Sequence, residues 1–250
     1  MKEQHFFYVP QAASANELPE EEAQHALRVL RVSEGDEIML MDGQGTFHRA
    51  EITLTTGKRC VYSIVESIAQ VRQWAGHLHI AVAPTKNIGR MEWMVEKCTE
   101  IGIDELTFLA CRYSERRVIK EERMEKIVVS AVKQSRKAWK PVINGLTPFS
   151  AFIARPRVGQ LFIAHCMEEF PRAFLFDALR TDIDTLRTGA VPTPNAHDIT
   201  VLIGPEGDFS EEEVQAAMAA GYASVHLGKS RLRTETAALS ALMMLHLSVP

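Results

Sequence analysis

The sequence predicts an α/β protein in which a small β-barrel precedes a larger domain built on a parallel sheet. After residue 76, apolar runs of strand length alternate with helical stripes, a pattern typical of a parallel sheet with helices on both faces. Before residue 70, short alternating runs are separated by turn signals, as in a small barrel. We therefore expect two domains, residues 1–73 and 74–250, in this chain of 250 residues.

The N-terminal domain is expected to contain three strands and one short helix. The helix covers residues 20–30, with Arg28 and Arg31 at its end. Asp42 and Gly43 form a turn between the first two strands. The strands are expected at residues 36–41, 46–54 and 60–68.

The C-terminal domain is expected to alternate strands with helices. The expected strands are residues 78–83, 106–110, 160–165, 199–203 and 222–227. The expected helices are residues 91–101, closed by Gly102, then 124–132, 211–220 and 234–247. The loop around residues 188–197 is expected to be the most mobile segment.

Two short turns near the C-terminus carry most of the functional information. Each follows an apolar strand run and precedes a helix, which is where open α/β sheets bind ligands. In the first turn, Gly204 and Gly207 allow backbone angles that other residues avoid, and they allow a ligand to approach closely. Ser210 and Glu213 form a capping box for the following helix. Two such turns in succession suggest one shared site.

The two turns read Leu202-Ile-Gly-Pro-Glu-Gly-Asp-Phe-Ser210 and Leu227-Gly-Lys-Ser-Arg-Leu-Arg-Thr-Glu-Thr-Ala237. They resemble the signature loops of the SPOUT superfamily of RNA methyltransferases, and most closely those of the RsmE family. That family methylates N3 of one uridine in small-subunit (16S) ribosomal RNA. Its first loop usually reads Gly-Gly where this chain has Gly207-Asp208, and its second has Arg-Ile where this chain has Ser230-Arg231.

The resemblance extends over nearly the whole chain, in the order of the family. The stretches His25-Ala-Leu-Arg-Val-Leu-Arg31, Gly35-Asp36 and Asp42-Gly-Gln-Gly45 are similar to its N-terminal domain. The stretches from Lys86 to Lys97-Cys-Thr-Glu-Ile-Gly102, Ser114-Glu-Arg-Arg117 and Gln134-Ser-Arg136 are similar to its middle.

The resemblance implies a fold, a cofactor and partners. Residues 1–73 would be a PUA-like RNA-binding barrel, and residues 74–250 a SPOUT domain whose trefoil knot holds S-adenosylmethionine. The protein would be a cytoplasmic homodimer that acts on 16S rRNA or the small ribosomal subunit. The residues expected to line the cofactor site are Ala164, His165, Ile203, Gly204, Glu206, Gly207, Leu227, Gly228, Ser230 and Leu232.

Methyl transfer to uracil N3 sets the requirements for the reacting groups. N3 is a poor nucleophile until it loses its proton, and the resulting charge spreads onto the flanking carbonyl oxygens. A site therefore needs a cation aimed at those oxygens and a place for the proton. We expect Arg233 to be the cation, with Arg231 as its rival, because a guanidinium can bond two oxygens. Glu206 and Glu235 are both available as the base, as loop-shaping groups or as groups that bond the cofactor, and a water path also remains open. Of these carboxylates, Glu206 is the one expected beside Arg233 among the catalytic residues.

The net charge of −4 does not favour RNA binding, but its distribution does. Residues 112–140 are net basic, whereas the rest of the chain is net acidic. The lysines between residues 120 and 126 alternate with Glu and are expected to form a solvated face. Trp139 is expected either to stack on a base or to pack at a helix end. The expected RNA contacts are Arg28, Arg31, Arg116, Arg117 and Arg136.

Several other classes are disfavoured. No apolar run is long enough to span a bilayer. The four cysteines are isolated, as in a reduced cytosolic protein. His77 and His79 could form a metal pair, but no third ligand is evident, so we expect no metal. Residues 223–230 loosely match a phosphate-binding loop, but their interior is strand-like. No Gly-x-Gly-x-x-Gly motif supports a Rossmann-type site.

Two other functions remain as alternatives. One is a SPOUT-type ribose 2′-O-methyltransferase that acts on tRNA or rRNA. The other is a non-catalytic RNA-binding module of ribosome assembly, which loss of the cofactor loops would favour, and those loops are intact here.

Overall fold

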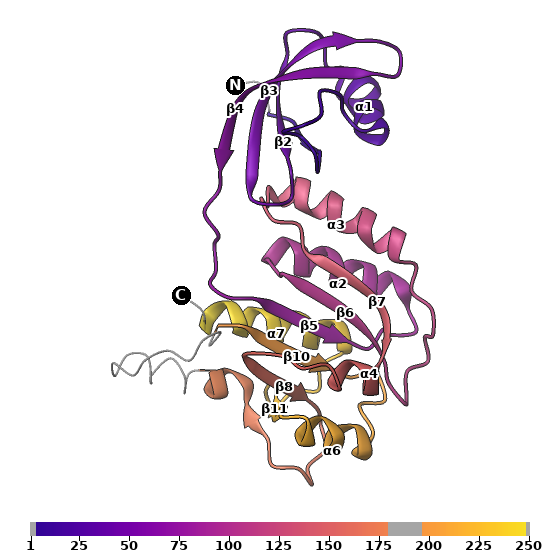
Figure 1. Ribbon diagram of the computed structural model, residues 1–250. Coiled ribbons are helices and arrows are strands. Elements are labelled where there is room, and N and C mark those ends of the chain that lie inside the picture. The colour runs from indigo at the N-terminus through magenta and orange to yellow at the C-terminus, as the bar shows by residue number, and fades with distance from the viewer. Residues whose placement is uncertain (1–3, 180–196, 249–250) are drawn as a thin grey trace, which may run out of the picture. The chain divides into compact units, whose positions relative to one another are not determined.

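The computed structural model describes residues 4–179 and 197–248, which form two compact units (Figure 1). The first unit contains residues 1–73 together with residues 129–140, and the second contains residues 74–128 and 141–250. Helix α3 (Glu121–Ser135) therefore contributes its two ends to different units. The expected division into residues 1–73 and 74–250 did not place residues 129–140 with the first unit. The two expected domains stay a prediction.

The first unit is built on a four-stranded sheet in the order β1-β2-β3-β4. Its strands are β1 (Phe6–Tyr8), β2 (Glu37–Met41), β3 (Thr46–Thr55) and β4 (Cys60–Ala69). β1 pairs with β2 in parallel, whereas β2, β3 and β4 are antiparallel neighbours. One face of the sheet buries a core that includes Phe7, Ile38, Leu40 and Ile52. The three expected strands are confirmed, and β1 is too short for its periodicity to predict.

The expected helix at residues 20–30 is present in two forms. Helix α1 (Glu20–His25) continues as a π-helical turn, η1 (Ala26–Leu30). Arg31 ends it in the left-handed region, with φ 56°. Arg28 and Arg31 are exposed at this end of the first unit.

Residues 129–140 are held within the first unit by several contacts. The Lys133 ammonium donates to the Glu22 carboxylate at 2.8 Å. Trp139 packs on Gly45, where an added Cβ would lie 2.7 Å from the indole ring. The Lys140 N–H also donates to the carbonyl of Gly43 at 2.9 Å. Of the two expectations for Trp139, packing is therefore the one seen in the first unit.

The second unit is a seven-stranded, fully parallel sheet in the order β7-β6-β5-β10-β8-β11-β9. Its strands are β5 (Leu78–Val82), β6 (Glu105–Ala110), β7 (Val142–Pro148), β8 (Gln160–Ala164), β9 (Ala173–Phe174), β10 (Ile199–Ile203) and β11 (Ala223–His226). The predicted parallel sheet is confirmed. The strands that were not predicted are the two edges: β9 has two residues, and β7 contains Gly145 and ends at Pro148, both unfavourable in strands.

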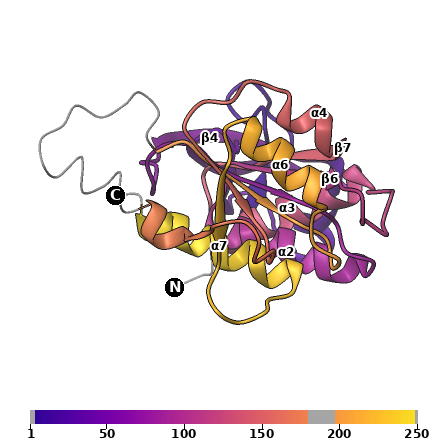
Figure 2. The same ribbon diagram turned by 90° about the horizontal axis from the view of Figure 1, so that it is seen from below.

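Helices cover both faces of this sheet (Figure 2). α2 (Ile88–Ile101) and α7 (Thr234–Ser248) pack against each other on one face. α4 (Phe149–Ile153) and α6 (Glu211–Ala219) cover the other. Gly102 ends α2 with φ 117°, as its position in the sequence predicted. No helix in the part of the chain that the structure describes is long and apolar enough to cross a membrane.

β10 is the last long strand to enter the sheet, yet it lies at its centre, between β5 and β8. The chain runs from β5 outward to β6 and β7, and then crosses to β8 on the other side of β10. Ligands bind outside the carboxyl ends of the strands at such a change of direction. The expected knot in this region stays a prediction, and most of the expected mobile loop, residues 188–196, lies outside the described residues.

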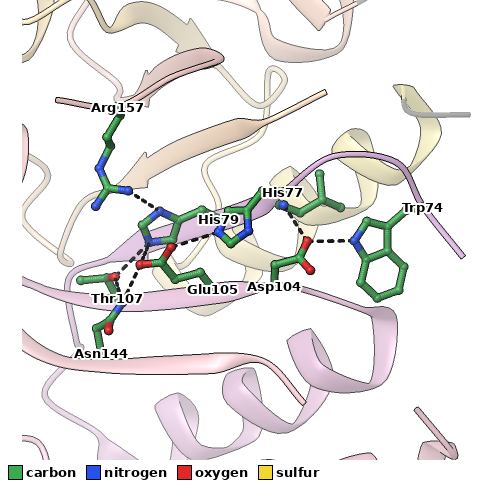
Figure 3. Close-up of polar contacts among 9 residues, drawn as sticks. Trp74, His77, His79, Asp104, Glu105, Thr107, Asn144 and Arg157 are labelled. Carbon is green, nitrogen blue, oxygen red and sulfur yellow. Dashed lines mark hydrogen bonds and ion pairs between the residues drawn. The ribbon is translucent and has the colours of Figure 1, made fainter. Parts of the chain in front are cut away.

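A buried polar network lies near the amino ends of the strands, where β5 and β6 begin (Figure 3). His79 is fully buried, and its two ring nitrogens lie 2.9 Å from the Thr107 hydroxyl and 3.1 Å from the Arg157 guanidinium. Because the guanidinium can only donate, Nδ1 accepts and Nε2–H donates to Thr107. Burial lowers the pKa of His79 to about 3, so the ring is neutral.

Glu105 connects this network to His77. Its carboxylate lies 3.0 Å from His77 Nε2, which raises the pKa of His77 and holds the pKa of Glu105 at about 2. Asn144 donates to the same carboxylate at 2.6 Å. The nitrogens of His79 are thus occupied by protein groups, and among residues 4–179 and 197–248 no three His, Cys, Asp or Glu side chains could hold a metal ion.

The network predicts a specific acid sensitivity. Because the folded-state pKa of His79 is below the unfolded value of 6.5, the unfolded chain binds one more proton between pH 6.5 and about 3. Stability should fall by about 1.4 kcal/mol per pH unit on acidification in this window. His79→Gln should remove this slope in urea unfolding measured at several pH values between 7 and 5.

The opposite shift at His77 provides the control. Its raised pKa contributes stability that is present below 6.5 and is lost as the pH rises through the folded pKa. His77→Gln should therefore leave the slope below pH 6.5 in place and instead remove a loss of stability that occurs above pH 6.5. Equal slopes for the wild type and His79→Gln would contradict a neutral His79.

Candidate functional site

Three strand ends of the second unit lie level with one another. The register pairs Ile203 of β10 with Ala164 of β8, and Ala164 with Val225 of β11. The loops that follow, residues 204–210, 165–172 and 227–233, therefore leave the sheet side by side. This register brings the two signature turns to one place with the loop after β8 between them.

The segment at residues 204–213, here called the acidic segment, ties the surrounding loops together. Three of its carboxylates each accept a backbone N–H from the loop after a different strand. The pairs are Glu206 with Lys86 N at 2.9 Å, Asp208 with Cys166 N at 2.7 Å, and Glu213 with Arg112 N at 2.8 Å. The loops joined in this way follow β5, β8 and β6. Carboxylates are strong acceptors for backbone amides.

Three further bonds complete the acidic segment. The Thr234 hydroxyl, at the start of α7, donates to the buried carbonyl of Gly204 at 3.1 Å. The predicted capping box is confirmed, since Ser210 N donates to Glu213 at 2.9 Å and Glu213 N donates to Ser210 Oγ at 3.2 Å. Glu213 thus uses one oxygen to begin α6 and the other to hold Arg112.

Of the two reasons expected for these glycines, the unusual backbone angles are wrong, and the close approach of a ligand stays a prediction. Neither Gly204 nor Gly207 has a positive φ. They are needed for space: an added Cβ would lie 3.2 Å from the Phe209 ring at Gly204, and 3.3 Å from Tyr113 Cβ at Gly207. The left-handed residue in this loop is Asp208, with φ 65°.

The second signature turn does contain a glycine that needs its conformational freedom. Gly228 has φ 124°, and an added Cβ there would meet no atom within 4 Å. Leu227 and Leu232 are half-buried, whereas Gly228 and Ser230 are exposed. The turn thus presents open backbone beside partly buried apolar side chains, which suits a ligand with an apolar face and polar edges.

His165 holds the loop after β8. Its buried ring contacts the Ser224 hydroxyl through Nε2, and Nδ1 accepts from Met167 N at 3.2 Å. Its carbonyl accepts from Arg172 at 2.8 Å. Because Nδ1 is an acceptor, the ring is neutral, and burial lowers its pKa accordingly.

The candidate reacting groups differ in what they already bind. Arg233 is exposed at the start of α7, and its carbonyl accepts the first helical N–H, that of Ala237, at 2.7 Å. Glu206 is exposed and holds Lys86 N–H. Glu235 is 6% exposed, with Oε1 at 3.7 Å from Arg90 Nε, and its Oε2 has no hydrogen-bond partner among the described residues.

The five expected RNA contacts fall in both units. Arg28, Arg31 and Arg136 belong to the first unit and are exposed, although Arg136 lies 4.9 Å above the Phe6 ring. Arg116 and Arg117 belong to the second unit. Arg117 donates weakly to the Arg112 carbonyl at 3.4 Å.

Arg116 has a structural contact that its sequence position did not reveal. It donates to the carbonyl of Thr85 at 3.0 Å and to that of Lys86. Together with the Glu206 bond to Lys86 N, this holds the loop after β5 from both sides. Arg116 is half-buried, so only part of its guanidinium can reach a phosphate.

Comparisons with known proteins identify the class. Residues 72–246 match a family model described as an RNA methyltransferase domain, and residues 18–65 match one described as an RNA methyltransferase PUA domain. The chain therefore belongs to the RNA methyltransferase family, as the resemblance of its signature loops predicted.

Individual relatives carry more specific names, those of ribosomal RNA methyltransferases. Ribosomal RNA small subunit methyltransferase E of Mycobacterium bovis is 30% identical over 247 residues, covering 94% of this chain and 88% of the relative. A probable rRNA-methyltransferase from Porphyromonas gingivalis is 42% identical, with a TM-score of 0.85 and 97% of each chain covered. Ribosomal RNA small subunit methyltransferase E from Neisseria gonorrhoeae, bound to S-adenosyl methionine, is 26% identical, with a TM-score of 0.77 and 96% of each chain covered.

The two bonds of Glu213 predict its contribution to stability. Glu213→Ala removes the acceptor for both Ser210 N and Arg112 N, and should lower the free energy of unfolding by about 1–2 kcal/mol. Hydrogen exchange should also become faster at the Arg112 amide.

Its neighbour Glu212 is the matched control. Glu212 forms an ion pair with Arg112, at 3.1 Å between largely exposed side chains, and its other contacts among the described residues are local, with Ser210 and its own backbone. Glu212→Ala should therefore change stability by no more than about 0.5 kcal/mol. If both variants lose equal stability, the bond from Glu213 to the loop after β6 is not the cause.

Proposed function

We propose that this protein transfers a methyl group from S-adenosylmethionine to N3 of a uridine in small-subunit ribosomal RNA. The observation that carries the proposal is the row of three strand ends, whose tied loops contain both signature turns, in a chain of the RNA methyltransferase family. The relative from N. gonorrhoeae, which covers nearly the whole chain, binds this cofactor.

The residues around the strand ends fit this cofactor. We assign the two ends of the pocket to Ala164 with His165, and to Ile203 with Gly204. The backbone of Leu227, Gly228, Ser230 and Leu232 forms the facing wall. Gly228 supports this assignment because its open surroundings let a ligand approach the main chain. When bound, the cofactor supplies an electrophilic methyl group on a sulfonium.

The chain's own groups then have to stabilise charge and accept a proton. We assign Arg233 to the charge that develops on the uracil oxygens, since it is exposed at the turn beside the pocket. Glu206 is assigned to loop geometry, because its carboxylate already holds Lys86 N–H. Glu235 is the better proton acceptor of the two, because its Oε2 has no partner among the described residues.

The first unit supplies the remaining contacts to RNA. Its match to the PUA domain of RNA methyltransferases supports this role, as does the exposure of Arg28 and Arg31. We also propose a cytoplasmic homodimer. Exposed apolar side chains on the packed helices α2 and α7, namely Trp93, Met243 and Leu247, support an interface with a second copy.

The reaction itself is tested by its product. In cells that lack the protein, 3-methyluridine should disappear from digested 16S rRNA when nucleosides are separated by mass spectrometry, and the wild-type gene should restore it. Loss of a 2′-O-methyl nucleoside instead would assign a ribose methyltransferase. No lost modification would favour a non-catalytic role.

The proposed role of Arg233 predicts that its removal slows the chemical step more than it weakens cofactor binding. Arg233→Ala should lower the single-turnover rate at saturating cofactor by about 100- to 1,000-fold, the usual effect of removing one preorganised donor. Arg233→Lys should recover little, because it keeps the charge and loses the two-pronged geometry. Cofactor affinity by calorimetry and a melting curve are the controls. A normal single-turnover rate would exclude Arg233 and direct attention to Arg231.

The exposed arginines of the first unit predict a salt effect on RNA binding. Phosphate contacts release counterions, so Arg28→Gln and Arg31→Gln should each reduce by about 1 the slope of log affinity against log salt for a 16S rRNA transcript. Arg49→Gln is the control, since that guanidinium is already paired with Glu37 at 2.9 Å and Glu66 at 3.2 Å. An unchanged slope in the Arg28 and Arg31 variants would contradict these contacts.

A further inference from the structure

Asp208 has a backbone conformation that side chains other than glycine rarely adopt. Its φ is 65°, and it is the one non-glycine residue with a positive φ among the described residues of the second unit. An ordinary side chain in the left-handed region costs about 1 kcal/mol or more. A glycine at this position would avoid that cost. Contacts of the Asp208 carboxylate can offset this cost.

Both oxygens of Asp208 bind backbone amides, and they bind different loops. Oδ1 accepts from Phe209 N at 2.8 Å, which fixes the carboxylate within its own turn. Oδ2 accepts from Cys166 N at 2.7 Å, in the loop after β8. A glycine at position 208 could adopt the same backbone but has no group that could reach Cys166.

The bond to Cys166 acts where the loop after β8 leaves the sheet. Residues 165–167 have few other restraints: the His165 ring accepts from Met167 N, and the His165 carbonyl accepts from Arg172. These bonds lie within the loop. Outside it, the His165 ring contacts the Ser224 hydroxyl and the His165 N–H donates to the Val225 carbonyl at 3.3 Å, both in β11. Asp208 is therefore the group that joins this loop to the loop after β10. The two loops form neighbouring walls of the proposed cofactor pocket.

We propose that Asp208 is a positioning residue that orders the loop after β8 against the acidic segment before the cofactor binds. A wall that is already ordered loses less conformational entropy on binding, so the affinity for the cofactor is higher. This inference rests on the proposed function, because it assigns the pocket to S-adenosylmethionine.

The test compares Asp208→Gly with Asp208→Asn in the full-length protein. Asp208→Gly keeps the left-handed backbone and removes both acceptors, whereas Asp208→Asn keeps one carbonyl acceptor in a residue that tolerates this conformation. S-Adenosylmethionine should bind Asp208→Gly about tenfold more weakly by calorimetry, equivalent to one charge-assisted bond. Asp208→Asn should recover part of this loss. The Cys166 amide should exchange faster in Asp208→Gly, and a melting curve should show that the variant is still folded at the temperature of the binding assay.

Two further measurements separate positioning from other effects. KM for the cofactor should rise more than kcat falls, because the bond acts before the chemical step. Glu212→Gln removes a nearby negative charge that has no bond to the loop after β8, and it should leave cofactor affinity within about twofold of the wild type.

Each contrary result has its own meaning. If Asp208→Gly binds the cofactor as the wild type does, or if its Cys166 amide exchanges at the wild-type rate, the positioning role is overturned. If Glu212→Gln weakens binding as much as Asp208→Gly does, the effect is one of charge, and the inference also fails. A folded wild-type protein that does not bind S-adenosylmethionine would refute the proposed function itself.

Discussion

Hydrogen bonds from backbone amides to the carboxylates of the acidic segment determine the architecture of the site. Loops that form a ligand pocket must keep one surface open, so the burial of apolar side chains such as Phe209 holds only part of each loop. Here Glu206, Asp208 and Glu213 add further restraints, each binding the main chain of a loop 42 to 120 residues away. Because the bonds reach the backbone of these loops, the side chains of the loops remain available for RNA or cofactor.

The position of β10 explains why one short segment can reach so many loops. β10 lies at the centre of the sheet with five buried residues, so the segment that follows it begins between the ends of β5 and β8. An edge strand could reach only one neighbour. The arrangement requires β10 to pair with strands formed much earlier in the chain, and such long-range pairing has a high entropic cost that the burial of β10 must offset. The site and the core of the second unit therefore depend on the same five residues.

The sequence predicted the features that local patterns encode. The strands other than β1, β7 and β9, the end of α2 at Gly102, and the capping box of Ser210 and Glu213 follow from apolar spacing and from short-range bonds. Long-range contacts left no such signal: nothing near Glu213 indicates Arg112, and the basic run at residues 112–140 did not show that its second half belongs with the first unit. Gly204 and Gly207 were expected in the turn for their backbone freedom, but neither has a positive φ. The structure shows instead that Gly204 lacks space for a side chain and that Asp208 is the left-handed residue, and neither feature has a signal in the sequence.

The hydrogen bonds of the acidic segment also reconcile a net charge of −4 with a substrate that is a polyanion. The carboxylates of Glu206, Asp208 and Glu213 face backbone N–H groups, whose positive ends offset part of the charge, and they are short of free acceptor sites. Arg116 is the basic counterpart: its donors are partly used by the carbonyls of residues 85 and 86, so it counts less toward phosphate binding than its charge suggests. Arg28 and Arg31 are exposed on the first unit. What matters for RNA recognition is therefore which charges the fold has already used, and a sum over the sequence does not reveal this.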